Sequence, residues 1–311
     1  MKEIVVISGK GGTGKTSIVA SFAALAKKAV LADCDVDAAD LHLLLEPDIK
    51  QTYDFIGGKR ASIITEKCIG CGRCAEVCNF DAAAFDGPPN GVVEKTYRID
   101  PMACEGCRVC VEFCPVDAIE FKDTVNGQWF ISDTRFGPMV HARLRPGQEN
   151  SGKLVSLIRK EAKRIATEQN KDLIIVDGSP GIGCPVIASI TGADLVLAVT
   201  EPTFSGRYDL NRVISLTEHF NIPTAVCINK YDINVNVATA IETEAQARNL
   251  RLVGKIAYDV EVTKAQIEAK SIVEYSSDSL KDQLICLWKS VMDMLEQPVN
   301  IRKKNNGKYR T

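Results

Sequence analysis

The chain has 311 residues, of which 45% are hydrophobic and 25% are charged, a balance typical of a globular protein with room for about two domains. Its formal net charge of −2 excludes a general electrostatic attraction to nucleic acid or to an anionic membrane. The first residues show no signal-peptide pattern, and no segment approaches the roughly 18 apolar residues of a membrane span. We therefore expect a cytoplasmic protein without a nucleic-acid partner.

Short apolar segments alternate with helix-length amphipathic segments along most of the chain. Nearly continuous apolar runs are typical of strands buried on both faces, and helices between such strands indicate parallel pairing. The sequence thus predicts an α/β fold with a doubly wound, mostly parallel sheet. The expected strands cover residues 3–8, 29–35, 172–178, 193–201, 223–229 and 251–257, and the expected helices cover 15–28, 152–169, 207–220, 238–249 and 280–295.

One part of the chain breaks this alternation. Residues 61–122 are rich in cysteine, with short β-like flanks at 61–65 and 118–122, and they follow the second expected strand. We expect them to form a small inserted α+β domain, within a main domain made of residues 1–60 and 123–298. A basic tail is expected at 299–311. The polar, glycine-rich stretch 137–155 is interpreted as a loop that contacts the insertion, a client or neither.

A glycine-rich loop joins the first expected strand to the first expected helix. It matches G-x-x-x-x-G-K-[ST], a pattern that binds phosphate in this strand–loop–helix context. Backbone N–H groups of such a loop surround the β-phosphate, Lys15 would bridge the β- and γ-phosphates, and Thr16 would bind Mg²⁺. The sequence therefore predicts a nucleoside triphosphate site. Its expected binding residues are Gly9, Lys10, Gly11, Gly12, Thr13, Gly14, Lys15, Thr16 and Ser17.

Carboxylates follow two of the expected strands, at the sheet edge where ligands bind in this architecture. Asp177 is expected to hold Mg²⁺ through water, and Asp35 to orient the attacking water or to bind magnesium. Asp33 could share that work. The alternative for all three is capping of a strand end. Gly181, in the loop after Asp177, is expected to belong to a switch that senses the γ-phosphate.

These motifs together resemble a known family. The loop form K-G-G-x-G-K-T, the D-x-D after the second strand and the later D-x-x-P-G are similar to the MinD/ParA/Mrp class of deviant Walker P-loop ATPases, which includes the nitrogenase iron protein. The resemblance covers most of the chain outside the insertion and implies an ATPase that works as a nucleotide-dependent homodimer. It implies that Lys10 reaches the partner's phosphates, so that Lys10, Lys15 and Asp35 are the expected catalytic residues. A solvated Lys10 is the alternative.

The nucleotide base has two candidate readings. Asn229, Lys230, Tyr231 and Asp232 match the N-K-x-D pattern that reads guanine through the aspartate in GTPases. The family resemblance instead implies adenine, contacted by the side chain of Asn229. ATP is the preferred prediction and GTP the alternative.

The chain contains 12 cysteines, and eight of them form two runs of spacing C-x2-C-x2-C-x3-C. In bacterial ferredoxins three thiolates of such a run hold one [4Fe-4S] cluster and the fourth serves the other cluster. Zinc is the competing metal, but its cysteine pairs usually lie on either side of a loop. The insertion resembles a two-cluster ferredoxin over its whole length, with Asn79 where that family usually has proline. The expected ligands are Cys68, Cys71, Cys74 and Cys114 for the first cluster and Cys78, Cys104, Cys107 and Cys110 for the second.

Cys184 lies outside the insertion, at an offset from Asp177 similar to that of a cysteine that binds the intersubunit cluster in nitrogenase iron proteins. A matching second ligand is missing from the sequence. We therefore expect a structural or transient role for Cys184, with an intersubunit metal site as the alternative.

Taken together, the motifs predict an ATP-binding and ATP-hydrolysing iron–sulfur protein. The expected homodimer couples ATP turnover to electron transfer through two [4Fe-4S] clusters, or to handling of the clusters, for a redox or iron–sulfur client protein. Two alternatives remain: a MinD/ParA-like positioning ATPase and an Mrp-like cluster carrier.

Overall fold

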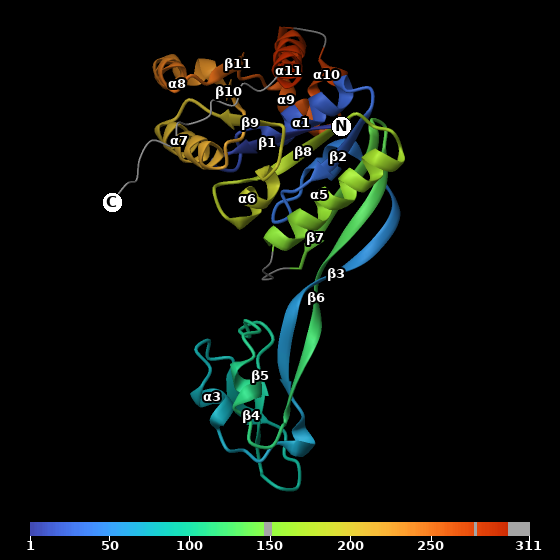
Figure 1. The fold of residues 1–311 in the computed structure, drawn as a ribbon, viewed down its shortest axis with the longest axis vertical. Coiled ribbons are helices and arrows are strands. Elements are labelled where there is room, and N and C mark those ends of the chain that lie inside the picture. Colours follow the sequence, from blue (N-terminus) through green and yellow to red (C-terminus); the bar gives the residue numbers. More distant parts are fainter. Residues whose placement is uncertain (146–150, 277–278, 298–311) are drawn as a thin grey trace, which may run out of the picture.

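The computed structural model describes residues 1–145, 151–276 and 279–297. Figure 1 shows a large α/β domain, a long two-stranded β-arm that leaves it, and a small unit at the far end of the arm. The expected basic tail at 299–311 lies outside the described residues. None of the described helices has the length and apolar content that a membrane crossing requires.

The main sheet has nine strands in the order β11-β10-β9-β1-β8-β2-β7-β6-β3. Pairing is parallel from β11 to β7 and antiparallel between β7, β6 and β3. The chain starts in the middle of the sheet and extends it in both directions, which confirms the prediction of a doubly wound, mostly parallel sheet. The strands of the parallel part are β1 (Lys2–Ser8), β2 (Ala29–Asp33), β7 (Gly137–Leu144), β8 (Leu173–Pro180), β9 (Leu195–Thr200), β10 (Thr224–Asn229) and β11 (Arg251–Ile256).

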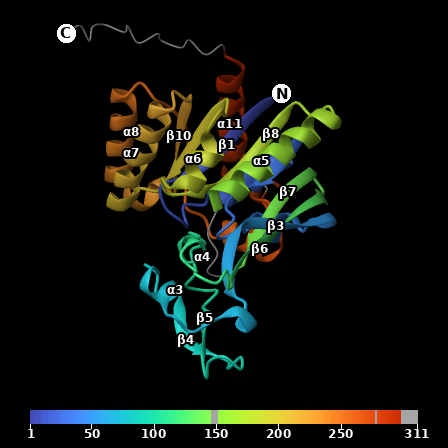
Figure 2. The same cartoon turned by 60° about the horizontal axis from the view of Figure 1, so that its bottom comes forward.

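Helices cover both faces of this sheet, and Figure 2 shows α5 to α8 in front of it and α11 behind it. Alternate residues of β1 enter separate cores: Val5 and Ile7 pack under α5 to α8, whereas Ile4 and Val6 pack under α1 and α11. Two buried faces explain why the strands read as continuous apolar runs. The helices are α1 (Lys15–Leu25), α2 (Leu41–Leu45), α5 (Ser151–Glu168), α6 (Cys184–Ile190), α7 (Phe204–His219), α8 (Val235–Ala247), α9 (Glu261–Ile267), α10 (Ile272–Tyr275) and α11 (Ser279–Glu296).

The arm consists of β3 (Asp48–Ile63) and β6 (Ile119–Thr134), paired in antiparallel register over their whole length. The sequence indicated strand structure only at 61–65 and 118–122, at the end of the arm next to the small unit. The expected insertion boundaries at 61 and 122 fall inside β3 and β6. Most of the first half of β3 is exposed, so it carries no alternation of buried and exposed residues that would reveal a strand. The loop expected at 137–155 is also wrong in its first half, because residues 137–144 form the buried strand β7.

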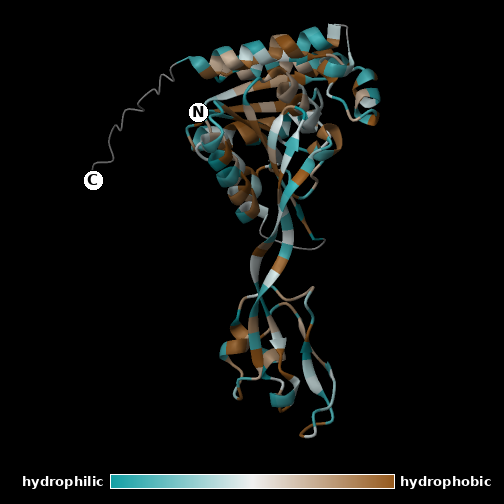
Figure 3. Cartoon of the chain, turned by 90° about the vertical axis from the view of Figure 1, so that its right-hand side faces the viewer, coloured by the Kyte–Doolittle hydropathy of each residue, from teal (hydrophilic) through white to brown (hydrophobic). Residues whose placement is uncertain are grey.

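The small unit contains α3 (Arg73–Glu76), α4 (Val109–Glu112) and a two-stranded sheet of β4 (Ala83–Gly87) and β5 (Thr96–Ile99). Figure 3 shows the brown, hydrophobic residues concentrated in the sheet of the large domain, while the small unit is mixed in hydropathy. The buried residues of its core are Ala61, Cys74, Ala82, Ile99 and Ile119. The small unit therefore has far less apolar burial than the domain that carries it.

Candidate nucleotide site and cysteine unit

The phosphate-binding loop lies between β1 and α1, and its backbone requires glycine. Gly12 and Gly14 have φ angles of 78° and 85°, in the left-handed region that other residues rarely adopt. A Cβ atom on Gly14 would also lie 2.3 Å from Nδ2 of Asn229. These conformations leave the loop backbone open to a ligand at the N-terminus of α1, where the helix dipole favours an anion.

Lys15 is buried between two carboxylates. Its Nζ donates to Asp177 Oδ1 at 2.6 Å and to Asp35 Oδ2 at 3.2 Å. Burial by itself lowers the pKa of Lys15, but the charges of Asp177 and Asp35 outweigh it, so the net pKa is raised. The ammonium group is therefore charged and held at the loop before any phosphate arrives.

The acidic groups around Lys15 have unused oxygens. Burial, followed by the charge of Asp177, raises the pKa of Asp33 well above its ordinary value, and burial also raises the pKa of Asp35. Asp33 Oδ1 accepts from the backbone N–H of Asp35. In the part of the chain that the structure describes, Asp33 Oδ2, Asp177 Oδ2 and Thr13 Oγ1 are buried without a hydrogen-bond partner. Buried oxygens of this kind need a proton, water or cation, so the donor set fits a hydrated Mg²⁺ ion.

Two neighbouring cavities adjoin the loop. The first, of about 420 Å³, is lined by residues 11–17 and by Asp35 and Pro180. The second, of about 200 Å³, is lined by Asn229 and by residues 256–259, and the two cavities share Gly12, Gly14, Ser17 and Gln266. A phosphate chain in the first and a base in the second would give one continuous nucleotide site.

Several predicted residues, among them Gly9, Gly181 and Asn229, lie at the border of this site or outside it. Gly9 does not line either cavity, and its Cα faces Asp209 of α7, whose Cβ would be 2.3 Å from a Cβ on Gly9. Gly181, with a φ angle of 94°, donates its N–H to Ser8 O. Asn229 donates from Nδ2 to Thr13 O at 2.7 Å and accepts at Oδ1 from the N–H of Lys230. In this structure Asn229 therefore fixes the phosphate-binding loop.

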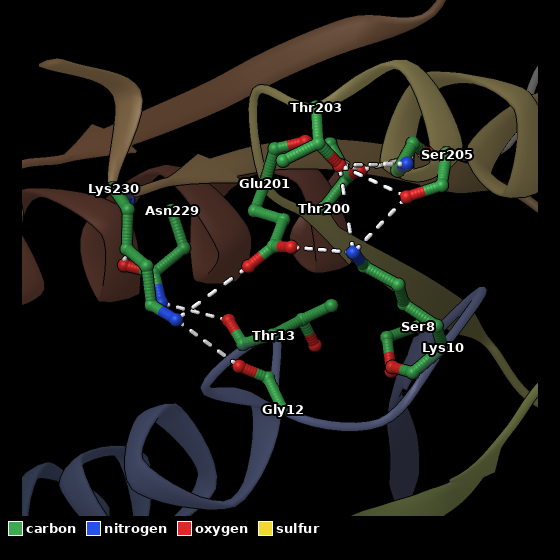
Figure 4. Close-up of polar contacts among 11 residues, drawn as sticks. Ser8, Lys10, Gly12, Thr13, Thr200, Glu201, Thr203, Ser205, Asn229 and Lys230 are labelled. Atoms are coloured by element: carbon green, nitrogen blue, oxygen red, sulfur yellow. Dashed lines mark hydrogen bonds and ion pairs between the residues drawn. The ribbon is translucent and has the colours of Figure 1, made fainter. Parts of the chain in front are cut away.

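Lys10 also lies outside the two cavities, and Figure 4 shows where it points. Its Nζ pairs with Glu201 Oε1 at 2.5 Å and donates to Thr203 Oγ1 and Ser205 Oγ. Lys230 approaches the other oxygen of the same carboxylate, at 3.5 Å. Thus the two lysines of the loop separate: Lys15 faces the phosphate cavity and Lys10 faces α7.

The sequence analysis missed Gln266 and Glu201. Gln266 lies on α9, lines both cavities and donates from Nε2 to Ser17 Oγ at 3.0 Å. Glu201 follows β9 directly, and its position after a strand of the same parallel sheet was the available signal. Gln266 had no such signal, because only the folding of the chain brings α9 to the loop.

The cysteines of the small unit surround two hollows. Each hollow is lined by three cysteines of one run and the fourth cysteine of the other, with Cys74 also bordering the second hollow. Cys68, Cys71, Cys74 and Cys114 line one, and Cys78, Cys104, Cys107 and Cys110 line the other.

The two cysteine runs have matching backbone geometry, which indicates an internal repeat. Backbone N–H groups of Ala82 and Ala118 donate to the Sγ atoms of Cys78 and Cys114, at 3.4 and 3.2 Å. At equivalent positions between the second and third cysteines, Gly72 and Arg108 both have positive φ angles. The fourth cysteine of each run thus accepts an equivalent backbone hydrogen bond, and the backbone turns in the same way before the third.

The spacing of these cysteines does not suit a single metal ion. Within the described ranges, no three His, Cys, Asp or Glu side chains come close enough to share one ion. In a [4Fe-4S] cluster each of four thiolates binds a different iron, so its ligands stand apart. Burial raises the pKa of Cys74 to about 11, so without a bound metal this thiol stays protonated. At least four thiols line each hollow, and four is the number of protein ligands that a [4Fe-4S] cluster takes.

Cys184 begins α6 and is exposed, far along the chain from the cysteine unit. It lies beside Gly152 of α5, where a Cβ would be 3.4 Å from Cys184 Cβ. Among the described residues it belongs to no group of three or more His, Cys, Asp or Glu side chains that could hold a metal ion.

Comparison with known proteins identifies the large domain. The family model described as "CobQ/CobB/MinD/ParA nucleotide binding domain" matches residues 4–272. The uncharacterized protein MJ0578 of Methanocaldococcus jannaschii is 37% identical over 75% of this chain and 79% of its own length. The septum site-determining protein MinD of Bacillus subtilis is 25% identical over 86% of this chain and 81% of its own length.

Solved structures agree on the fold. The cell division ATPase MinD of Pyrococcus furiosus has a TM-score of 0.57 at 15% identity, covering 94% of this chain and 99% of its own. A chain of the MinC:MinD cell division protein complex of Aquifex aeolicus has a TM-score of 0.57 at 17% identity, covering 97% of this chain and 99% of its own. A match to the family model over most of the residues, joined to a phosphate-binding loop on a doubly wound sheet, places this chain in the CobQ/CobB/MinD/ParA family of P-loop ATPases.

Proposed function

We propose that the chain is an ATPase whose nucleotide-dependent homodimer couples ATP turnover to two [4Fe-4S] clusters, for electron transfer to a redox or iron–sulfur client or for handling of the clusters. One observation carries this proposal: the eight cysteines of the small unit line two hollows, and β3 and β6 connect this unit to the sheet that holds the phosphate-binding loop. The comparisons support the ATPase fold; the cysteine geometry supports the iron–sulfur part.

In the nucleotide site, each residue has a role that its position supports. Thr16 and Asp177 would hold Mg²⁺, which would neutralise phosphate charge, and the free Oδ2 of Asp177 supplies an oxygen for the ion or its water. Lys15 would exchange its carboxylate partners for the β- and γ-phosphates. Asp35, at the wall of the phosphate cavity, would then orient the attacking water.

Adenine is the base that the second cavity favours. In this structure Asp232, the residue that would read guanine, already accepts at Oδ1 from the N–H of Tyr258 at 2.7 Å. Asp232 also does not line the second cavity, so it is not placed to read a base bound there. Titration with fluorescent adenine and guanine nucleotides tests the choice, and tighter guanine binding would overturn it.

A homodimer is favoured by the direction of Lys10 and by the surface beside it. Lys10 lies outside its own phosphate cavity, and its side chain is 32% exposed beside Glu201, so a second subunit can compete for it there. Phe204 and Tyr208 of α7 are 79% and 65% exposed next to this lysine, and large apolar side chains grouped on a surface indicate contact with another protein. A cation supplied by the partner would stabilise the transition-state charge, as an arginine finger does.

The central experiment measures iron and nucleotide coupling in the same protein. Anaerobically reconstituted protein should hold about eight iron atoms per chain, as two cubane clusters require, and give the electron paramagnetic resonance signal of reduced [4Fe-4S]. ATP should shift that signal or the reduction potential in the wild type and not in Lys15→Met. Stoichiometric zinc without iron would refute the iron–sulfur part, and clusters unaffected by ATP would refute the coupling.

Electron transfer and cluster delivery are separated by a second measurement. Reconstituted protein is incubated with an apo-ferredoxin acceptor, with and without ATP. Clusters that stay bound support electron transfer, while rapid transfer to the acceptor supports a carrier.

A positioning ATPase is the second candidate, and the similarity to MinD proteins favours it. In that case the nucleotide-bound dimer would bind a surface or a partner protein and the cysteines would serve only the structure of the small unit. ATP-dependent co-sedimentation with liposomes or with DNA would support this reading.

A further inference from the structure

The contacts of Lys10 in the nucleotide-free chain form a defined binding place rather than a solvated position. Glu201 supplies a carboxylate whose side chain is only 17% exposed, and Thr203 and Ser205 supply two hydroxyl acceptors. Burial by itself raises the pKa of Glu201, but the lysines beside it outweigh burial and the net pKa is lowered. Three acceptors thus hold one ammonium group at the start of α7, as Figure 4 shows.

The same carboxylate has a second cationic partner. Lys230 Nζ lies 3.5 Å from Glu201 Oε2 and donates to Gly12 O of the phosphate-binding loop at 3.1 Å. If Lys10 moves away from Glu201, the carboxylate remains paired with Lys230. The partly buried negative charge of Glu201 is therefore not left without a partner. The arrangement can therefore release Lys10 at low cost while the phosphate-binding loop stays supported.

We propose that Glu201 is a positioning residue that holds Lys10 on its own subunit until a second copy, carrying its nucleotide, competes for the ammonium group. This inference rests on the proposed nucleotide-dependent dimer. The neighbour's triphosphate carries more charge than one carboxylate, so it wins the competition only when it is bound and correctly placed. Glu201 thereby sets a threshold: it opposes dimerisation of empty subunits and of subunits bound to a nucleotide without a γ-phosphate.

The contact itself is tested in the nucleotide-free protein. Acylation of individual lysines by an amine-reactive reagent is followed by mass spectrometry in the wild type and in Glu201→Gln. We expect Lys10 to react several-fold faster in the variant, while Lys255, which pairs with Glu242, reacts at the same rate in both. An unchanged rate at Lys10 would overturn the inference.

The consequence is tested by sedimentation with a non-hydrolysable ATP analogue. Partly exposed ion pairs are weak, and each dimer breaks two of them, so Glu201→Gln should lower the protein concentration for half-dimerisation about fivefold. Ser205→Ala removes one acceptor and should give a smaller change in the same direction. Glu242→Gln is the matched control, since it removes the carboxylate of another lysine pair, between Glu242 of α8 and Lys255 of β11. Equal thermal midpoints would show that all variants fold.

Two further comparisons make the outcomes distinct. The effect of Glu201→Gln should persist in a Lys230→Met background, whereas its loss there would show that Glu201 acts through Lys230 and would overturn the inference.

Lys10→Ala should abolish analogue-dependent dimerisation. If the wild type fails to dimerise, or Lys10→Ala dimerises equally, the proposed function fails. If those two behave as expected and Glu201→Gln dimerises like the wild type, only the present inference fails.

Discussion

The nucleotide site and the cysteine unit have similar loop conformations, but they differ in the size of the hydrophobic core beneath them. Both present ligand groups from loops with residues of positive φ, such as Gly14 in one and Gly72 in the other. At the nucleotide site, however, Lys15 and Asp177 neutralise each other above two extensive cores. The cysteine unit has eight cysteines around two hollows and a core of five buried residues. The first site can therefore keep its form without a ligand, whereas the proposed function predicts that the second depends on bound clusters for stability.

Removal of iron is the largest expected perturbation. Chelation and oxidation of the reconstituted protein should unfold the small unit while the ATPase domain stays folded, because only the small unit lacks a sufficient core. Amide hydrogen exchange of residues 61–122 should approach the unfolded rate, with β1 and β8 unchanged. A metal-free unit that stays protected from exchange would contradict the comparison.

The reverse perturbation removes the charge at the nucleotide site. Lys15→Met leaves Asp177 and Asp35 without their cation and should reduce ATP hydrolysis by about three orders of magnitude. The iron content of the small unit should not change. Lys67→Met, at an exposed lysine of the small unit, is the control for loss of a positive charge. Loss of iron in Lys15→Met would show that the two regions do not fold independently.

A pH titration probes the junction between the regions. His141 of β7 is 7% exposed and shares a hydrogen bond of 2.9 Å with Ser132 of β6. Burial, and then the charges of His42 and Arg143, lower its pKa from 6.5 to about 4. A lowered folded-state pKa stabilises the protein above pH 6.5, and this contribution is lost as pH falls towards 4.

For His141 the loss amounts to about 3 kcal/mol of unfolding free energy, since one pKa unit corresponds to about 1.4 kcal/mol. The difference in stability between the wild type and His141→Gln should therefore shrink from pH 7 to pH 4 in urea unfolding. His219→Gln, at an exposed histidine, is the control. A difference that is constant with pH would refute a buried neutral imidazole at the junction.

The smallest expected effect concerns the contact between the arm and the second cysteine run. Gly106 has a φ angle of 64°, and a Cβ there would lie 2.2 Å from the carbonyl oxygen of Lys59. Gly106→Ala should destabilise the iron-loaded unit by about 2 kcal/mol, seen as earlier loss of cluster absorbance in urea. Gly91→Ala has the same conformational cost, with φ at 83°, but meets no atom within 4 Å. Equal effects would show that the arm does not contact this loop tightly.

The sequence predicted the buried strands of the large domain better than the strands of the arm. All six strands expected from apolar runs are present, because burial on both faces leaves a continuous apolar signature. The arm strands β3 and β6 were missed beyond their ends, since exposed strands carry no such signature. Strand β7 was missed because polar residues such as His141 and Arg143 interrupt it. Gln266 was missed because contact between α9 and the loop depends on distant parts of the chain.

By itself, the sequence determined the local chemistry: the glycine loop with Lys15, the carboxylates at strand ends and the two cysteine runs. These are short-range patterns, in which spacing fixes geometry through the backbone. Only the tertiary structure decided which partners those groups meet. It set Lys10 against Glu201, tied Asn229 to Thr13 O, and carried the cysteine unit away from the ATPase domain on an arm. Such contacts join residues far apart in sequence, and they arise from the packing of whole elements, which no local pattern encodes.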